Sequence, residues 1–444
     1  MTPKQFLLEE CANIELALSE LLRLDYLAGG AADFHRELTQ RLETIRRLIG
    51  PIAPSDPDSV SLFSAELSRL SELVHRIERS HAGEFSWPFA EELRSLADPL
   101  CREDLRTPGQ EPIIRILAEG GLTAYRIHLE DDLSRIPFDR RIFTIVFPRT
   151  LKHHVLSHAI FGHEIGHAAW SIPQLRSRLL GEVSQPMFLK GALSSITNSR
   201  HWLSKDDAPP EIKEVIEECG WKPDDLDQDV LSSWHEELLC DLFGLLTFGP
   251  AFLAAHRALL STLDPHGFWF GEYHPPYVTR RAMLRHACEH LGWPKHPGVA
   301  DAPLRTALDH FWEAQLGDAE VGTWPDVIEP SAVAAAVQGL LTVLKDVGAL
   351  FEYPSASVLK HIVSMLDGQL PPCGSDLSGS KEPALQKVDF RTILFAGWVQ
   401  WHHLAKTTAT LDERTFSHLN RLCERGILQQ RAINLFVAHR DRQP

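Results

Sequence analysis

The chain has 444 residues, 44% of them hydrophobic and 23% charged, which is ordinary for a globular protein with room for large cores. The net charge of −16 argues against nucleic acid as the main partner, because phosphate binding needs clustered lysine and arginine. The sequence lacks a run of roughly 20 apolar residues, so we expect no membrane insertion. Seven scattered cysteines without a CxxC pair are typical of free thiols in a reducing compartment, and a cytoplasmic location is expected.

Residues 1–105 are predicted to form a helical domain. Apolar residues recur there at three- and four-residue spacing, and turns rich in glycine or proline separate four helical segments. The segments span residues 9–27, 31–49, 59–80 and 87–100. Antiparallel helices in a bundle are the expected arrangement, serving as a scaffold or as the binding site for a regulatory partner.

Residues 106–300 are predicted to form a second domain that contains a small β-sheet. Thr123–Leu129 alternates between polar and apolar side chains, and Ile142–Phe147 is rich in β-branched and aromatic residues, as strands are. The edge of such a sheet can hold an extended peptide by strand addition. Pro148 ends the second strand, and Leu151–Trp170 has helical apolar spacing without a proline, so we expect a helix there.

Two histidines on that helix carry the strongest chemical signal. His163 and His167 are four residues apart, so both imidazoles lie on one helical face and can bind one zinc ion. Glu164 lies beside the first of them, where its carboxylate can take a proton from a water on the metal. The nearby His158 lies well away from this face and is expected to be a core or surface histidine.

A third ligand is expected further along the chain. Glu237 and Asp241 are four residues apart on one helical face, on which Gly244 follows. We expect Glu237 to bind the metal, Asp241 to accept the free ring N–H of a ligand histidine, and Gly244 to let two helices approach closely. Glu236 is the alternative ligand, and an ordinary amphipathic helix with exposed acids is the other interpretation. Cys240 is expected to be a small buried hydrophobe rather than a ligand.

HExxH followed by a helix with ExxxD resembles the gluzincin metallopeptidases. A third element, His274-Pro-Pro-Tyr-Val-Thr-Arg280, is similar to the HPPxxxR element of the CAAX-prenyl-type and heat-shock membrane metallopeptidases. The resemblance covers residues 163–280. It implies that His163, His167 and Glu237 bind the metal, that Glu164 is the base and that Asp241 supports a ligand. It also implies that His274 and Arg280 bind the substrate backbone and the oxyanion.

The sequence departs from those membrane peptidases in having no membrane-spanning helices, so prenylated substrates are not expected. A rigid turn that enters a helix near Val278 is the alternative interpretation of His274-Pro-Pro. The insertion at 172–229 is long enough to shape or cover the active-site cleft, and a solvated surface element is an equally favoured interpretation. Phe268, Trp269 and Phe270 are expected to pack in the core, with a specificity pocket as the alternative interpretation.

Residues 301–444 are predicted to form a third domain, which is again helical. Its four segments with apolar periodicity are 333–350, 355–366, 390–404 and 411–423. The stretch 367–383 is rich in glycine, proline and serine and is predicted to be a flexible loop or hinge.

The sequence therefore predicts a mainly α fold with a small β-sheet (α+β), in which a zincin-like core is flanked by helical domains. The expected function is that of a zinc-dependent endopeptidase, which hydrolyses a specific protein or peptide substrate through a zinc-activated water with Glu164 as general base. The alternative is a zinc-binding regulatory or partner-binding protein with little activity, against which the presence of Glu164 argues. A helical scaffold with an accidental motif is the third interpretation.

Overall fold

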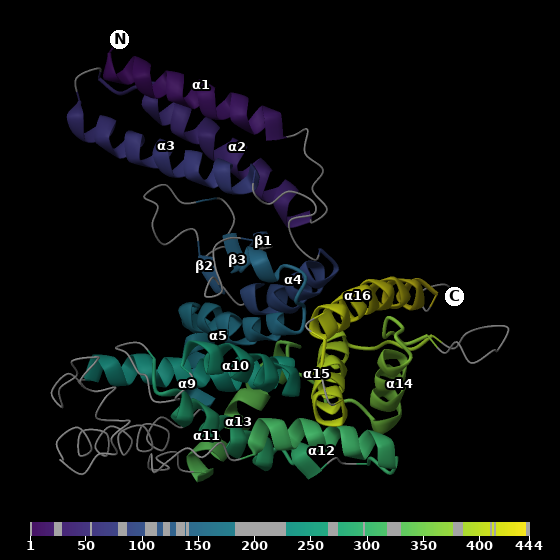
Figure 1. Cartoon of the computed structure of the whole chain (residues 1–444). Coiled ribbons are helices and arrows are strands. Elements are labelled where there is room, and N and C mark those ends of the chain that lie inside the picture. Colours follow the sequence, from purple (N-terminus) through teal and green to yellow (C-terminus); the bar gives the residue numbers. More distant parts are fainter. Residues whose placement is uncertain are drawn as a thin grey trace. The chain divides into compact units, whose positions relative to one another are not determined.

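The computed structural model divides the chain into two compact units, Met1–Lys152 and His153–Pro444 (Figure 1). The structure describes residues 2–21, 29–53, 56–78, 87–102, 113–118, 125–129, 138, 142–182, 228–264, 274–295, 298–317, 330–375, 385–408, 411–412 and 414–440.

The first unit contains three long helices, α1 (Pro3–Leu21), α2 (Gly29–Ile49) and α3 (Pro57–Glu78) (Figure 1). Each of them packs against the other two. Apolar residues at helical spacing supply the buried faces, and side chains such as Phe34 and Ile45 are fully buried between the helices. The predicted helical bundle is therefore present in this unit.

A small mixed sheet belongs to the same unit and has the strand order β1-β3-β2. The central strand β3 (Ile142–Phe147) is parallel to β1 (Ile113–Ala118) and antiparallel to β2 (Arg126–Leu129). Every residue of β3 is buried, which explains why its sequence is apolar except for Thr144 instead of alternating. Helix α4 (Trp87–Arg102) and helix α2 both contact β1, so the sheet shares its core with the bundle.

The second unit contains the two helices that carry the motif residues. α5 (Phe161–Ser171) packs along α9 (Gln228–Phe248). Gly249, with a φ of 65°, turns the chain from α9 into α10 (Pro250–Leu263), a backbone conformation that favours glycine. α11 (Tyr277–His290) contacts both α9 and α10. The four helices bring residues from distant parts of the sequence to one place.

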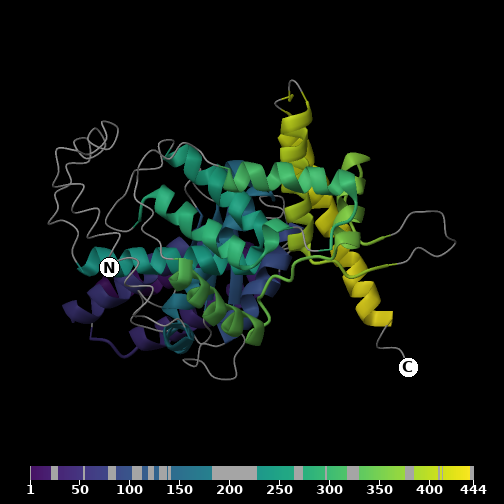
Figure 2. The ribbon, with the colours of Figure 1, turned by 90° about the horizontal axis from the view of Figure 1, so that it is seen from below.

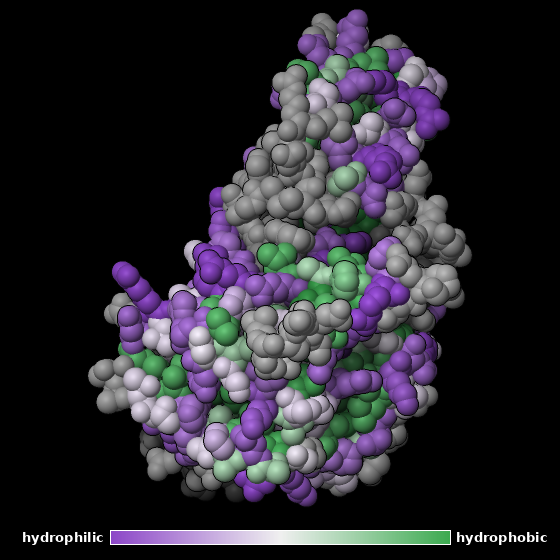
Figure 3. Space-filling model, turned by 90° about the vertical axis from the view of Figure 1, so that its right-hand side faces the viewer, coloured by the Kyte–Doolittle hydropathy of each residue, from purple (hydrophilic) through white to green (hydrophobic). Residues whose placement is uncertain are grey.

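Further helices complete this unit. They are α6 (Pro173–Glu182), α12 (Ala302–Leu316), α13 (Pro330–Asp346), α14 (Ala356–Asp367), α15 (Phe390–Thr407) and α16 (Arg414–Arg440). The first eleven residues of α15 are all buried, and this helix packs against α12, α14 and α16 (Figure 2). On the face shown in Figure 3, hydrophobic residues are interspersed among hydrophilic ones.

The predicted fold class is confirmed, because the described residues are mainly helical with one three-stranded sheet. The predicted strand Ile142–Phe147 is confirmed with its bounds. The predicted helix Leu151–Trp170 is wrong in its first half, where Ser157–Ile160 forms a 3-10 helix and α5 begins only at Phe161. A 3-10 helix repeats every three residues, so apolar spacing of three and four does not separate it from an α-helix.

The described part of the chain leaves some predictions untested. The division into 1–105, 106–300 and 301–444 stays a prediction, and the boundary between the two compact units lies at residue 152. The aromatic loop 268–270, residues 183–227 of the predicted insertion and residues 376–383 of the predicted hinge lie outside the described part of the chain. No helix among the described residues combines the length and the apolar character needed to cross a membrane.

Candidate metal centre

Glycines allow α5 and α9 to approach closely. A Cβ atom at Gly162 would lie 2.7 Å from the Cα of Gly244, and one at Gly166 would lie 2.9 Å from the Cα of Cys240. These separations are shorter than a Cβ atom tolerates, so both α5 glycines are needed for the crossing. Gly244 also leaves room for the ring of Phe252 on α10. The close approach predicted at Gly244 is confirmed.

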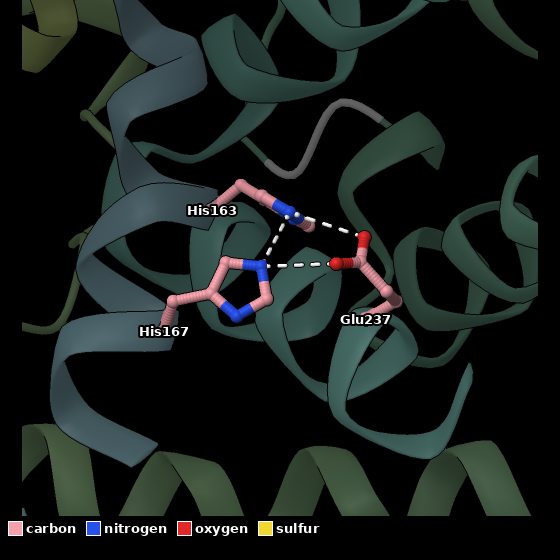
Figure 4. A group of neighbouring side chains, drawn as sticks. All are labelled: His163, His167 and Glu237. Carbon is pink, nitrogen blue, oxygen red and sulfur yellow. Dashed lines mark hydrogen bonds and ion pairs between the residues drawn. The ribbon is translucent and has the colours of Figure 1, made fainter. Parts of the chain in front are cut away.

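The two motif histidines and Glu237 point toward one another across this crossing (Figure 4). The Nε2 atoms of His163 and His167 are 3.1 Å apart. The carboxylate of Glu237 reaches both rings, with Oε2 3.3 Å from Nε2 of His163 and Oε1 3.1 Å from Nε2 of His167. Among the described residues, these three side chains form a group whose ligand atoms all lie within 4.8 Å of one another, and they can hold a metal ion.

The hydrogen bonds of the two rings determine which nitrogen faces the centre of this group. Nδ1 of His163 lies 2.8 Å from Asp241 Oδ1, and Nδ1 of His167 lies 2.8 Å from Glu236 Oε1. An ionised carboxylate only accepts hydrogen bonds, so each Nδ1 carries the ring proton. When the rings are neutral, both Nε2 atoms therefore present lone pairs to each other and to Glu237. Burial lowers the pKa of both rings, but Glu237 and Asp241 near His163, and Cys240 and the two glutamates near His167, outweigh it and raise the pKa. The site therefore attracts a positive charge, which either a proton or a metal ion can supply.

This convergence of lone pairs fits a cation. Oε2 of Glu237 is buried and has no hydrogen-bond partner in the described structure. Donor atoms about 2.0–2.1 Å from a tetrahedral metal ion are about 3.3 Å from one another, close to the three separations in this site. A cation at the centre replaces the repulsion between the electron pairs by attraction. The residues therefore fit a tetrahedral metal ion by both distance and donor chemistry.

Asp241 accepts a hydrogen bond from Nδ1 of His163 and is itself bound by a buried arginine. Nε and Nη2 of Arg280 each donate to the Asp241 carboxylate at 2.7 Å, and His256 Nε2 lies 3.1 Å from Oδ1. Asp241 is fully buried. Burial acts to raise the pKa of Asp241, but Arg280, His256 and His163 outweigh it and hold the pKa well below its usual range. The Asp241 carboxylate is therefore ionised and fixed.

Glu237 stays ionised for a similar reason. Burial acts to raise its pKa, but the rings of His163 and His167, when they carry a second proton, and the guanidinium of Arg280 hold the pKa below the usual range of a glutamate. Nη2 of Arg280 lies 3.6 Å from Oε2 of this carboxylate. The site therefore carries a permanent negative ligand in addition to two imidazoles.

Glu164 and His274 occupy different surroundings near the ligands. Burial raises the pKa of the partly buried Glu164, although His163 and His167 act in the opposite direction. A raised carboxyl pKa suits a group that must accept and return a proton. The His274 side chain is 50% exposed, with Nε2 3.8 Å from Oε1 of Glu237. Burial lowers the pKa of His274, so its ring is neutral near pH 7.

All seven residues predicted from the sequence lie in or next to one cluster. The contacts of Arg280, however, differ from the expected ones. Arg280 is buried, and its donors are directed at Asp241. Binding of the substrate oxyanion by Arg280 stays a prediction. Cys240 is buried and is not a member of the ligand group, and burial raises the pKa of its thiol to about 12. The prediction that Cys240 is a small buried residue is confirmed, and His158 is likewise a buried core histidine.

Two residues of the site, Glu236 and His256, were not predicted from the sequence to support its other side chains. Glu236, considered only as an alternative ligand, instead accepts from His167. His256 is a single histidine in an apolar helix, and nothing in the pattern of α10 distinguishes it from a core histidine. An acid directly before the ligand glutamate was the one available signal for Glu236.

Comparison of the chain with protein families, with curated proteins and with solved structures finds no match.

Proposed function

We propose that this protein is a zinc-dependent endopeptidase that hydrolyses peptide bonds of a specific protein or peptide substrate. The observation that supports the proposal most is the convergence of His163, His167 and Glu237 beside Glu164. A metal-binding group alone would serve a regulatory protein equally well. The additional carboxylate of Glu164, held beside the ligands, is a group that hydrolysis needs and simple metal binding does not.

The donor set favours zinc in a catalytic rather than a structural role. Two imidazoles and a carboxylate suit Zn²⁺, and catalytic zinc sites use three protein ligands where structural sites use four. The ligand group among the described residues has three members. When bound, Zn²⁺ would supply a Lewis acid for the scissile carbonyl and would lower the pKa of a water from 15.7 to about 7.

The residues of the chain then have separate tasks in the hydrolysis. Glu164 takes a proton from the attacking water as its oxygen bonds to the carbonyl carbon. His274 lies at the solvent-accessible side of the ligands, where its neutral ring donates a hydrogen bond to the oxyanion. The C–N bond breaks as Glu164 returns the proton to the leaving amine. Arg280 acts through Asp241, which orients His163.

We infer that the protein acts in the cytoplasm. The five described cysteines, Cys11, Cys240, Cys288, Cys373 and Cys423, are free thiols, as is usual in a reducing compartment. The helices of the first unit are the expected binding site for a regulatory partner. The large helical part of the molecule suits recognition of one protein better than bulk digestion.

The test of this function compares the wild type with Glu164→Gln on a mixed peptide library, in the presence of zinc, with cleavage followed by mass spectrometry. Loss of the general base should lower the rate about 10²–10⁴-fold while zinc content stays at the wild-type level. Glu313→Gln is the matched control, because Glu313 is exposed and pairs only with Lys406 among the interactions described for it. Cleavage by Glu164→Gln at the wild-type rate would exclude the proposed mechanism.

A further inference from the structure

The two ligand histidines are supported by carboxylates in very different surroundings. Asp241, behind His163, is 0% exposed and accepts from both Arg280 donors. The Glu236 side chain, behind His167, is 32% exposed, and its one described hydrogen bond is the one to His167. The carboxylate behind His163 is therefore fixed by a buried network, whereas the carboxylate behind His167 lies within reach of water and has the ring as its one described partner.

The exposure of the ligands follows the same asymmetry. The His167 side chain is 29% exposed, whereas the side chains of His163 and Glu237 are each 8% exposed. To turn away from the centre, His163 would have to break its bond to a carboxylate that Arg280 fixes in place. His167 has to break the hydrogen bond to Glu236, which lies within reach of water, and its contact with the Cys240 thiol. Of the three ligands, His167 is thus the one with the lowest barrier to leaving.

We propose that Glu236 is a positioning residue that holds His167 on the metal and sets the rate at which the site exchanges its metal with solvent. The inference rests on the metal site of the proposed function and adds a regulatory property to it. A carboxylate that accepts from Nδ1 fixes the ring tautomer, keeps the Nε2 lone pair toward the metal and increases its basicity. The metal enters and leaves on the side of His167, because His163 and Glu237 remain in place while His167 turns.

The position of Glu236 in α9 explains how one helix supplies both a ligand and a support. Successive residues of a helix are about 100° apart, so the neighbouring side chains of Glu236 and Glu237 reach different sides of the His167 ring. Glu237 meets Nε2 at 3.1 Å, and Glu236 meets Nδ1 at 2.8 Å. Glu236 therefore accepts from Nδ1 of this imidazole, while Glu237 faces its metal-binding Nε2.

The test measures release of zinc from zinc-loaded full-length protein into an excess of a chromogenic chelator. Glu236→Ala should release zinc about 10–100-fold faster than the wild type. Glu236→Gln should restore much of the slow release, because its amide oxygen accepts the same hydrogen bond, though without the charge. Glu313→Ala, which removes an exposed glutamate with one ion pair, should behave as the wild type.

Two results would overturn the inference. One is release from Glu236→Ala at the same rate as from Glu313→Ala. The other is equally fast release from Glu236→Ala and Glu236→Gln together with a lowered unfolding midpoint of both metal-free proteins, which would show a purely structural role. A wild type that captures no zinc would instead refute the proposed function itself, so the two failures are distinguishable.

Discussion

Both units of the molecule bury charged side chains, but the charges are arranged in different ways. In the first unit, Arg41 of α2 donates to Glu66 of α3 at 2.6 Å, with the two side chains 3% and 6% exposed. The guanidinium also lies over the ring of Phe138. In this contact a positive group meets a negative one.

The cluster in the second unit contains the opposite arrangement at its centre. When the rings are neutral, the Nε2 atoms of His163 and His167 and the carboxylate of Glu237 all present electron pairs to one another. An ion pair needs nothing further, whereas converging acceptors need a cation. The two clusters differ in the charges of the groups that face each other and not in their burial. The charges therefore distinguish a candidate binding site from a structural ion pair.

The largest effect on stability is expected from Asp241→Ala. This change leaves the buried guanidinium of Arg280 without its carboxylate and should lower the free energy of unfolding by about 3–5 kcal/mol. Urea denaturation measures it. Asp346→Ala is the control, because Asp346 is 62% exposed and pairs with Arg178, and exposed pairs contribute about 0–1 kcal/mol. Equal losses in the two variants would contradict the assignment of Asp241.

Removal of the metal should affect only the second unit. At a free zinc concentration 100 times the Kd, binding stabilises the folded site by about 2.7 kcal/mol. Hydrogen exchange measured by mass spectrometry, with zinc and with a chelator, should show that chelation lowers protection in α5 and α9. Protection in α1, α2 and α3 should stay unchanged. A chelator effect of equal size in both units, or in neither, would count against a metal site at the α5–α9 crossing.

A smaller effect is expected from Gly162→Ala. The added methyl group would meet the backbone of Gly244 at 2.7 Å and push α5 from α9, which should lower stability by about 1–3 kcal/mol and weaken zinc binding. Gly368→Ala is the control, because a Cβ atom at Gly368 finds only ordinary contacts at 3.5 Å or more. Thermal unfolding and zinc titration measure the two effects, and a wild-type affinity in Gly162→Ala would show that the close crossing is not required.

The smallest loss is expected from replacing the structural ion pair as a whole. The double change Arg41→Met with Glu66→Leu should leave the free energy of unfolding unchanged or raise it, since apolar residues commonly replace a buried pair without loss. Zinc content should equal that of the wild type. A loss of zinc in this double variant would mean that the two buried clusters are not independent.

The sequence was sufficient to predict the elements with an unambiguous pattern. Ile142–Phe147 is a run of β-branched and aromatic residues next to a proline, and it forms β3 with these bounds. Ile113–Ala118 was not predicted as a strand, because a short apolar run fits a buried helix as well. The start of α5 was misplaced because a 3-10 helix shares the apolar spacing of an α-helix.

The cluster of candidate metal ligands was predictable from the sequence, and the residues that support it were predictable only in part. His163, His167, Glu237 and Asp241 share spacings of four residues, which local helix geometry turns into shared faces. The partners of Asp241 on α10 and α11 depend on how distant helices pack, which periodicity does not contain. The role of Glu236 depends on the rotation of α9 relative to α5, so from the sequence it was one more acid beside a ligand.

The most direct test of the metal site is the zinc content of the purified wild type and of Glu237→Ala, measured by elemental analysis with Glu313→Ala as control. The convergence of His163, His167 and Glu237 predicts about one zinc ion per chain in the wild type and in the control, and a sharply reduced content in Glu237→Ala. A folded wild-type protein that contains no metal and gains no stability from added zinc would contradict it.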